Sequence, residues 1–369
     1  MEEIVIPFDI NYPDALSRND TIEIRKKFNN LKKKSQNEAK ISECYYCKSK
    51  IKSFCNSHTV PRVFLNNISE DGKFSYINSI IEAPHVNKTK GMNEAGTFYL
   101  LCNNCDGKVF KDYENLENYE RIPTIKMLSQ IDMKNNLKNI SKRLIEIKLY
   151  ENIAEKSFVD MSEIIKIADV DLEEFKSAYN IAKKRDIKPF PNDYYIGFYE
   201  QLPYTVPIAF QGTIALIKGL DGSIVNNVYS KDLNYRIKNM SLCIFPLKNS
   251  TIVMIFVDGK NKRYSQFFRQ LKEKELRTQL EIINYILFLY CEDYFISSNV
   301  SREVLDELKE ISSKTAGIIT NIPFESNTKI EFAKERFDLN HRKKIPNLLS
   351  EKYSIKNLES KENKLEEKN

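Results

Sequence analysis

The pattern of apolar positions predicts two long helices in the middle of the chain. Over residues 125–153, apolar side chains recur at the three- and four-residue spacing of one helix face. These positions are Leu128, Ile131, Leu137, Ile140, Leu144 and Ile147. A second helix is expected to begin at Asp171, because Glu174 follows at capping-box spacing, and to end near Arg185. Neither segment carries a catalytic pattern, so residues 121–188 are interpreted as a scaffold.

Residues 193–258 have a different pattern, in which short runs of β-branched and aromatic residues replace the helical spacing. The runs are Tyr195–Tyr199, Val206–Phe210, Thr213–Ile217, Leu242–Phe245 and Thr251–Val257. They predict a mostly antiparallel sheet. Helical spacing returns over residues 264–295 and 302–312. Strands followed by helices predict an α+β fold for residues 189–320.

The remaining parts of the chain complete a division into five segments. Residues 1–40 are expected to form a strand, from the alternation of Ile4, Ile6 and Phe8, and then a helix. Residues 41–120 contain most of the cysteines, and residues 321–369 are expected to be a charged tail that is partly disordered. The segments are therefore 1–40, 41–120, 121–188, 189–320 and 321–369.

Composition limits the function without defining it. The 369 residues carry a net charge of +6, which permits a nucleic-acid partner but does not require one. The longest apolar stretch, residues 282–291, is too short to span a bilayer. No targeting signal is visible, so we expect a cytoplasmic protein without membrane contact, whose seven cysteines are reduced thiols or metal ligands.

Four of the cysteines form two CxxC pairs, Cys44 with Cys47 and Cys102 with Cys105. A CxxC turn places two thiolates on one side of a loop, so two such turns can close a tetrahedral zinc site. The 54 residues between the pairs exceed the usual gap, so the prediction of structural zinc rests on both pairs being intact. Two alternatives stay open: four unligated thiols, or Cys55 in place of one ligand.

The residues between and after these pairs carry a resemblance to a known family. Ser57-His58-x-x-Pro61 lies between the pairs, Asp106 follows Cys105, and Asp112-Tyr113-Glu114 follows in turn. Over residues 41–120 this order resembles the HNH-type, treble-clef (ββα-metal) endonuclease-like proteins of bacteria. The resemblance implies a zinc-bound treble-clef module and hydrolysis of DNA phosphodiester bonds with Mg²⁺ or Mn²⁺. Such modules occur in restriction, mobile-element and phage-defence proteins.

The resemblance also implies roles for individual residues. His58 falls at the position of the general base that activates water, and Asp106 falls where the family often has an Asn or His near the ion. Phe110 stands where a later ligand is often His, so Asp112 or Glu114 would have to complete the ion site. The alternatives are that His58 is a hydrogen-bonded residue that stabilises a cysteine turn, and that Asp106, Asp112 and Glu114 are ordinary acidic residues on a helix surface.

Two basic residues near the cysteine pairs are candidates for phosphate contacts, and two functions other than catalysis stay open. Arg62 and Lys108 could contact phosphates or could be solvated charges. The module could also be a zinc-braced binding module, for nucleic acid or protein, that lacks catalysis. A third possibility is a component of a multi-protein system whose partner binds the C-terminal region, residues 193–312.

Overall fold

The computed structural model describes residues 18–77, 89–91, 96–156, 160–230, 232, 234–291, 293–316 and 334–366. The chain divides into two compact units that are interleaved along the sequence. The first unit comprises Met1–Ser57, Phe98–Phe110 and Ser129–Lys184, and the second comprises His58–Thr97, Lys111–Leu128 and Arg185–Asn369. The cysteine-rich segment 41–120 thus contributes to both units. The strand expected within residues 1–14 lies outside the described residues.

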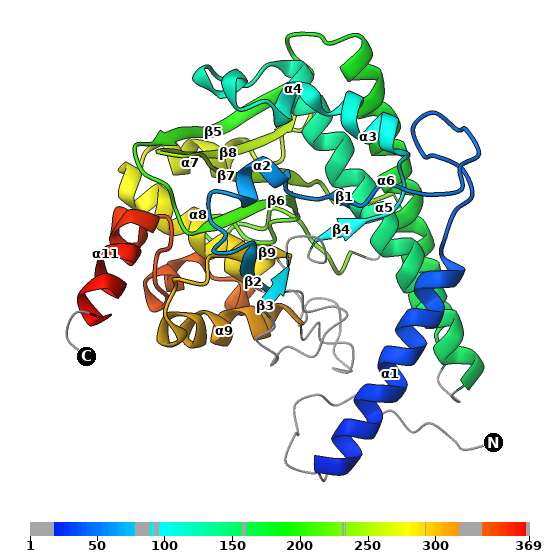
Figure 1. Ribbon diagram of the computed structural model, residues 1–369. Coiled ribbons are helices and arrows are strands. Elements are labelled where there is room, and N and C mark those ends of the chain that lie inside the picture. Colours follow the sequence, from blue (N-terminus) through cyan, green and yellow to red (C-terminus); the bar gives the residue numbers. More distant parts are fainter. Residues whose placement is uncertain are drawn as a thin grey trace. The chain divides into compact units, whose positions relative to one another are not determined.

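Helices form most of the first unit (Figure 1). They are α1 (Arg18–Glu38), α3 (Asn103–Val109), most of α5 (Ile125–Lys156) and most of α6 (Ser162–Ile187). Leu31 of α1 packs with Leu149 and Ile153 of α5 and with Met161, which precedes α6. The helical spacing over residues 125–153 therefore predicted α5 closely.

The second long helix, α6, begins earlier than its sequence suggested. It starts at Ser162, whose backbone N–H is 2.9 Å from the Asp160 carboxylate that accepts its hydrogen bond. Asp160 therefore lies where a capping side chain satisfies a free N–H of the first turn. Asp171, the expected start, lies inside the helix and accepts a 2.7 Å hydrogen bond from Arg143 of α5. Asp171 therefore forms an ion pair with Arg143 and does not cap the helix.

A seven-stranded antiparallel sheet organises the second unit (Figure 1). Its strands are β2 (Lys73–Ile77), β3 (Thr89–Gly91), β5 (Tyr194–Leu202), β6 (Ile208–Ile214), β7 (Met240–Pro246), β8 (Thr251–Asp258) and β9 (Tyr294–Ile296). They lie in the order β3-β2-β9-β6-β7-β8-β5. The prediction of an antiparallel sheet with helices is confirmed. The addition of β2 and β3, from the cysteine-rich segment, was not expected.

Both faces of the central strands are covered, which explains their unbroken apolar sequences. Side chains alternate along a strand, so Leu242 and Ile244 of β7 face one side while Phe245 faces the other. The first side belongs to the large core of this unit. On the second side, Phe245 stacks on Phe64 at 4.3 Å between ring centroids, and Tyr119 meets both rings edge-on. Phe64 lies in α2 (Arg62–Leu65) and Tyr119 in the 3-10 helix η2 (Leu116–Glu120), which follows α4 (Lys111–Glu114).

The helices after the sheet differ from the expectation at one point. Residues 264–295 form two helices, α7 (Ser265–Lys272) and α8 (Leu276–Tyr290), and then β9, where a continuous helical region was expected. Asp293 has a positive φ of 51° directly before β9, so the backbone leaves the helical path there. Helix α9 (Arg302–Ala316) follows as expected. The aromatic residues at the end of this region are therefore divided between helix α8 and strand β9.

The charged C-terminal segment contributes to the core over its described residues. It contains the 3-10 helices η3 (Leu339–Lys344) and η4 (Glu351–Tyr353) and the helix α11 (Ile355–Glu366). Five of its aliphatic side chains are buried in the core of the sheet, namely Leu339, Ile345, Leu348, Leu349 and Leu358. Asn284 of α8 donates a hydrogen bond to the Pro346 carbonyl and accepts one from the Leu348 N–H. A few apolar residues are thus enough to pack the described part of this segment against the core of the second unit.

Two short strands, β1 (Ser57–His58) and β4 (Thr97–Phe98), pair in a separate two-stranded sheet. Within the described ranges, no helix has the length and apolar character needed to cross a bilayer.

Candidate metal centre

The first CxxC pair is held in a tight knuckle by its own backbone. The Lys48 N–H donates to the Cys44 carbonyl at 2.8 Å, and the Cys44 N–H donates to the Ser49 carbonyl at 2.9 Å. Lys48 has a φ of 61°, which reverses the chain directly after Cys47. Both thiol groups therefore project from one side of a closed turn.

The second pair sits at the start of α3. Cys102 is the N-cap residue of the helix, and its sulfur accepts a 3.4 Å hydrogen bond from the Cys105 N–H. The Cys102 N–H in turn donates to the Cys44 sulfur, also at 3.4 Å. N–H groups and the positive end of a helix favour the thiolate form of cysteine. The backbone thus supplies positive partial charge where a cysteine-ligated metal places negative charge.

The four sulfur atoms lie within 4.8 Å of one another, and the four cysteines are free thiols. Sulfurs around a tetrahedral zinc, with Zn–S bonds of about 2.3 Å, stand about 3.8 Å apart. Hydrogen bonds with Ser49 lower the pKa of Cys47 to about 6, whereas burial raises the pKa of Cys105. The four predicted ligands therefore form a site that could hold a metal ion, and an all-sulfur set fits zinc.

Helix α6 braces the first knuckle through two residues one turn apart. The Tyr179 ring meets the Tyr45 ring edge-on, with 5.1 Å between centroids. The Lys183 ammonium donates to the Tyr46 carbonyl at 2.7 Å and lies 4.0 Å from the Tyr46 ring centroid. Neither residue carried a sequence signal beyond its place on a predicted helix.

Asp106 is joined to a buried lysine. The Cys55 thiol donates to one carboxylate oxygen at 3.2 Å, and the Lys134 ammonium is 3.8 Å from the other. The same ammonium lies 4.5 Å from the centroid of the Phe110 ring. The Lys134 side chain is only 3% exposed, against 19% for Asp106. Lys134 lies on the buried part of α5, and no sequence pattern singled it out.

The other expected site residues lie in the second unit, except Lys108. His58 ends β1 and is half-buried. Asp112 of α4 is 3.1 Å from the Lys126 ammonium, and Glu114 ends the same helix. In the part of the chain that the structure describes, the four cysteines form the one group of three or more potential ligands close enough to share an ion.

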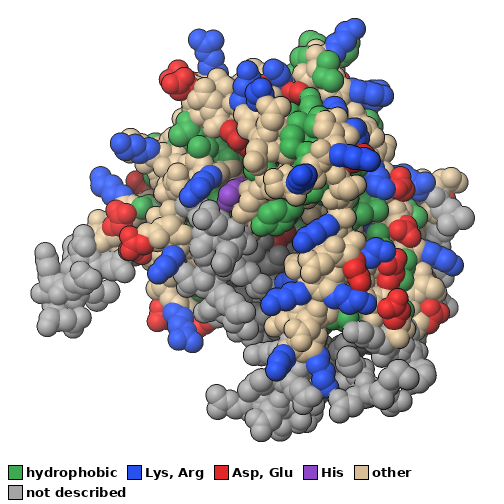
Figure 2. Space-filling model, turned by 45° about the vertical axis from the view of Figure 1, so that its right-hand side comes forward, with side chains coloured by type: hydrophobic (Ala, Val, Ile, Leu, Met, Phe, Trp, Pro, Cys, Tyr) green, Lys and Arg blue, Asp and Glu red, His purple; other side chains and the backbone are tan. Residues whose placement is uncertain are grey.

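The two residues expected to meet phosphate are both exposed. Arg62 opens α2, and Lys108 lies in the last turn of α3. Lysine and arginine side chains are spread over much of the face shown in Figure 2, with acidic side chains between them. The charge of this face is therefore basic but dispersed.

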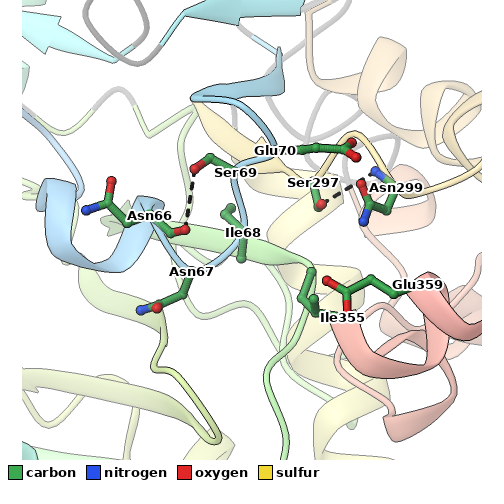
Figure 3. A pocket seen from close by; sticks show the side chains of 9 residues that line it. All are labelled: Asn66, Asn67, Ile68, Ser69, Glu70, Ser297, Asn299, Ile355 and Glu359. Carbon is green, nitrogen blue, oxygen red and sulfur yellow. Dashed lines mark hydrogen bonds between the residues drawn. The ribbon is translucent and has the colours of Figure 1, made fainter.

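The second unit also contains a polar pocket (Figure 3). It has a volume of about 480 Å³, and its lining includes Asn66, Asn299 and the carboxylates of Glu70 and Glu359. Glu70 already accepts a 3.0 Å hydrogen bond from Ser298. None of the residues singled out by the sequence lines this pocket, so the cysteine cluster remains the candidate site.

Comparison of the chain with protein-family models, with curated proteins and with solved structures found no match.

Proposed function

We propose that the chain is a zinc-stabilised, HNH-like protein that binds nucleic acid. In this proposal, Asp106 does not hold a divalent ion for hydrolysis of the phosphodiester bond. The order of its local elements supports the family assignment. A cysteine knuckle is followed by β1, then β4, and then a helix whose first turn carries the second cysteine pair. A treble clef has its elements in the same order, so this order supports the proposal, with a long insertion between the two strands.

The observation that carries the proposal is the buried pairing of Asp106 with Lys134. Asp106 is the carboxylate at the family's ion position, and an ammonium group lies 3.8 Å from it. Like unit charges 4 Å apart repel by about 4 kcal/mol at an effective dielectric constant of 20, and a divalent ion would roughly double this. Phe110, at the later ligand position, offers an aromatic face to the same ammonium. The residues at these positions do not fit a bound Mg²⁺ or Mn²⁺.

Nucleic acid is the partner that the charge and the family resemblance favour. The net charge is +6, and Lys108 is exposed on α3, the helix that contains Cys105 and has Cys102 as its N-cap. Arg62 is exposed at the start of α2. Contacts of such residues with phosphate release counterions, so the affinity should fall as salt rises.

Binding is tested by fluorescence anisotropy with labelled duplex DNA, single-stranded DNA and RNA over a range of salt concentrations. We expect salt-dependent binding to at least one of them that is weakened at least severalfold by Lys108→Glu and by Arg62→Glu. Lys248→Glu changes an exposed lysine in the turn after β7 and serves as the matched control. Absence of binding to all three probes by zinc-loaded protein at low salt would refute the proposal.

Hydrolysis of DNA is the second candidate, and the position of His58 at the end of β1 favours it. In HNH nucleases the general base stands at the end of the first strand. Plasmid cleavage by the zinc-loaded protein, with Mg²⁺ and with Mn²⁺, decides between the candidates. Cleavage that His58→Ala abolishes while zinc content stays unchanged would establish the nuclease and overturn the proposed binding role without hydrolysis.

A further inference from the structure

The polar pocket of the second unit is formed by segments that lie far apart in the sequence (Figure 3). Its lining comes from residues 66–70, between α2 and β2, from residues 297–299, directly after β9, and from the first two turns of α11. Seven of its nine lining residues are polar, namely Asn66, Asn67, Ser69, Glu70, Ser297, Asn299 and Glu359. Its volume of about 480 Å³ lies within the range of small-molecule sites. The pocket has no part in the proposed function.

Several polar atoms of the pocket are hydrogen-bond acceptors. The side-chain oxygen of Asn299 is buried and has no hydrogen-bond partner in the described part of the chain. Asn67 donates its side-chain amide to two backbone carbonyls, at 3.1 and 2.9 Å, so its side-chain oxygen is the group left for a ligand. Glu70 and Glu359 add two carboxylates, which accept and do not donate when ionised. A ligand that donates hydrogen bonds would satisfy these groups.

The charges of the lining narrow the class of ligand. Two carboxylates line the pocket, and no lysine or arginine is among its described lining residues, so an anion would meet no counter-charge there. The start of α11 offers little to an anion, because the N–H groups of Ile355, Asn357 and Leu358 donate to backbone carbonyls. A metal ion fits poorly, since within the described ranges only the four cysteines form a group of three or more potential ligands. An organic cation fits the lining best.

We propose that this pocket binds a small alkyl diamine. One ammonium group would contact Glu70 and the other Glu359, with Asn299 accepting a further hydrogen bond, and such charge-assisted bonds are among the stronger ones. Ser298 already donates to Glu70 at 3.0 Å, and an ionised carboxylate can accept several more bonds. The two apolar lining residues, Ile68 and Ile355, would face the methylene chain.

The charge of the whole chain makes such binding informative. The net charge is +6, so a cation is not attracted to the protein in general and must find a local acidic site. The proposed site lies in the second unit, whereas the cysteine cluster lies in the first. Diamine binding therefore depends neither on zinc nor on nucleic-acid binding.

The test is isothermal titration calorimetry of the zinc-loaded full chain with putrescine and with the diol of the same carbon chain. We expect putrescine to bind with a Kd below about 1 mM and the diol to show no binding at about 10 mM. Glu70→Gln and Glu359→Gln should each weaken putrescine about tenfold, because each removes a charged acceptor. Glu351→Gln changes an exposed glutamate of the same C-terminal segment, outside the pocket, and should leave the affinity unchanged.

The fold of the variants is checked by their thermal midpoints without ligand. Both lining glutamates are exposed, so neither substitution should change the midpoint appreciably. Equal binding of the diol would indicate a site for hydroxyl groups and overturn the assignment. So would a putrescine affinity within about twofold of wild type in both glutamine variants, which would place the cation elsewhere, or no putrescine binding by wild type up to about 10 mM.

Discussion

The pairing of Asp106 with Lys134 makes the sharpest prediction, because removal of either charge leaves the other inside the protein. In Asp106→Asn, the ammonium of Lys134 loses this carboxylate, and its side chain is only 3% exposed, so little water replaces the lost partner. Removal of one partner of such a pair typically costs about 3–5 kcal/mol. In Lys134→Met the remaining carboxylate is 19% exposed and keeps the Cys55 hydrogen bond, so we expect a smaller loss of about 2 kcal/mol.

The double variant Asp106→Asn/Lys134→Met leaves neither charge behind. Because a buried ion pair can be replaced by packed uncharged side chains at little cost, we expect the double variant to lie within about 1 kcal/mol of wild type. The interaction energy from the double-mutant cycle should then be at least about 4 kcal/mol.

The assay is urea unfolding of the zinc-loaded protein followed by far-ultraviolet circular dichroism, with the zinc content of each variant measured beforehand. Shifts of the midpoint at constant m-value report stability alone. If both single variants stay within about 0.5 kcal/mol of wild type, as surface pairs do, the buried pair is not formed. The argument against a divalent ion at Asp106 would then fail with it.

Three further predictions concern other parts of the molecule. Cys105→Ser should abolish stoichiometric zinc binding, and a chelator should lower the melting midpoint of wild type but not of this variant; retained zinc in Cys105→Ser would contradict the four-cysteine site. Burial and the neighbouring carboxylate raise the pKa of Cys55 to about 11, so its alkylation by iodoacetamide at pH 8 should be roughly 240-fold slower than that of an unperturbed cysteine of pKa 8.5. Peptide mass spectrometry measures the rate, and ordinary reactivity would contradict this environment of the Cys55 thiol. Phe64→Ala should cost about 3–5 kcal/mol in urea unfolding, because Phe64 is fully buried and stacked on Phe245, and a loss below about 1 kcal/mol would contradict this packing.

Local periodicity accounts for what the sequence predicted well. The β-rich runs at Leu242–Phe245 and Thr251–Val257 became β7 and β8, since their residues suit a sheet covered on both faces. The two CxxC pairs identified four cysteines whose sulfurs lie close enough to hold a metal ion, because such a site requires those residues at that spacing.

Long-range contacts account for what the sequence did not predict. Lys134 contacts Asp106, which lies 28 residues earlier in the chain. From the sequence alone, a lysine on a predicted helix is expected to be a solvated charge. Strand β9 pairs with both β2 and β6, and its three residues fitted the helical spacing of the preceding segment equally well. Periodicity reports the conformation of a segment but not the partner that will bury it.

The interleaving of the two units has a consequence for how the chain folds as it leaves the ribosome. The first unit needs residues up to Lys184, so helix α6 reaches the cysteine knuckle only after nearly half of the chain has been made. Strand β2 waits longer still, because Tyr76 pairs with Phe295. During that interval β2 can pair with β3, which follows it in the chain, but its other edge lacks β9 and can associate with other nascent chains. A fragment ending at residue 184 would keep this hazard permanently, so an attempt to produce the zinc-bearing unit alone should yield aggregation-prone material.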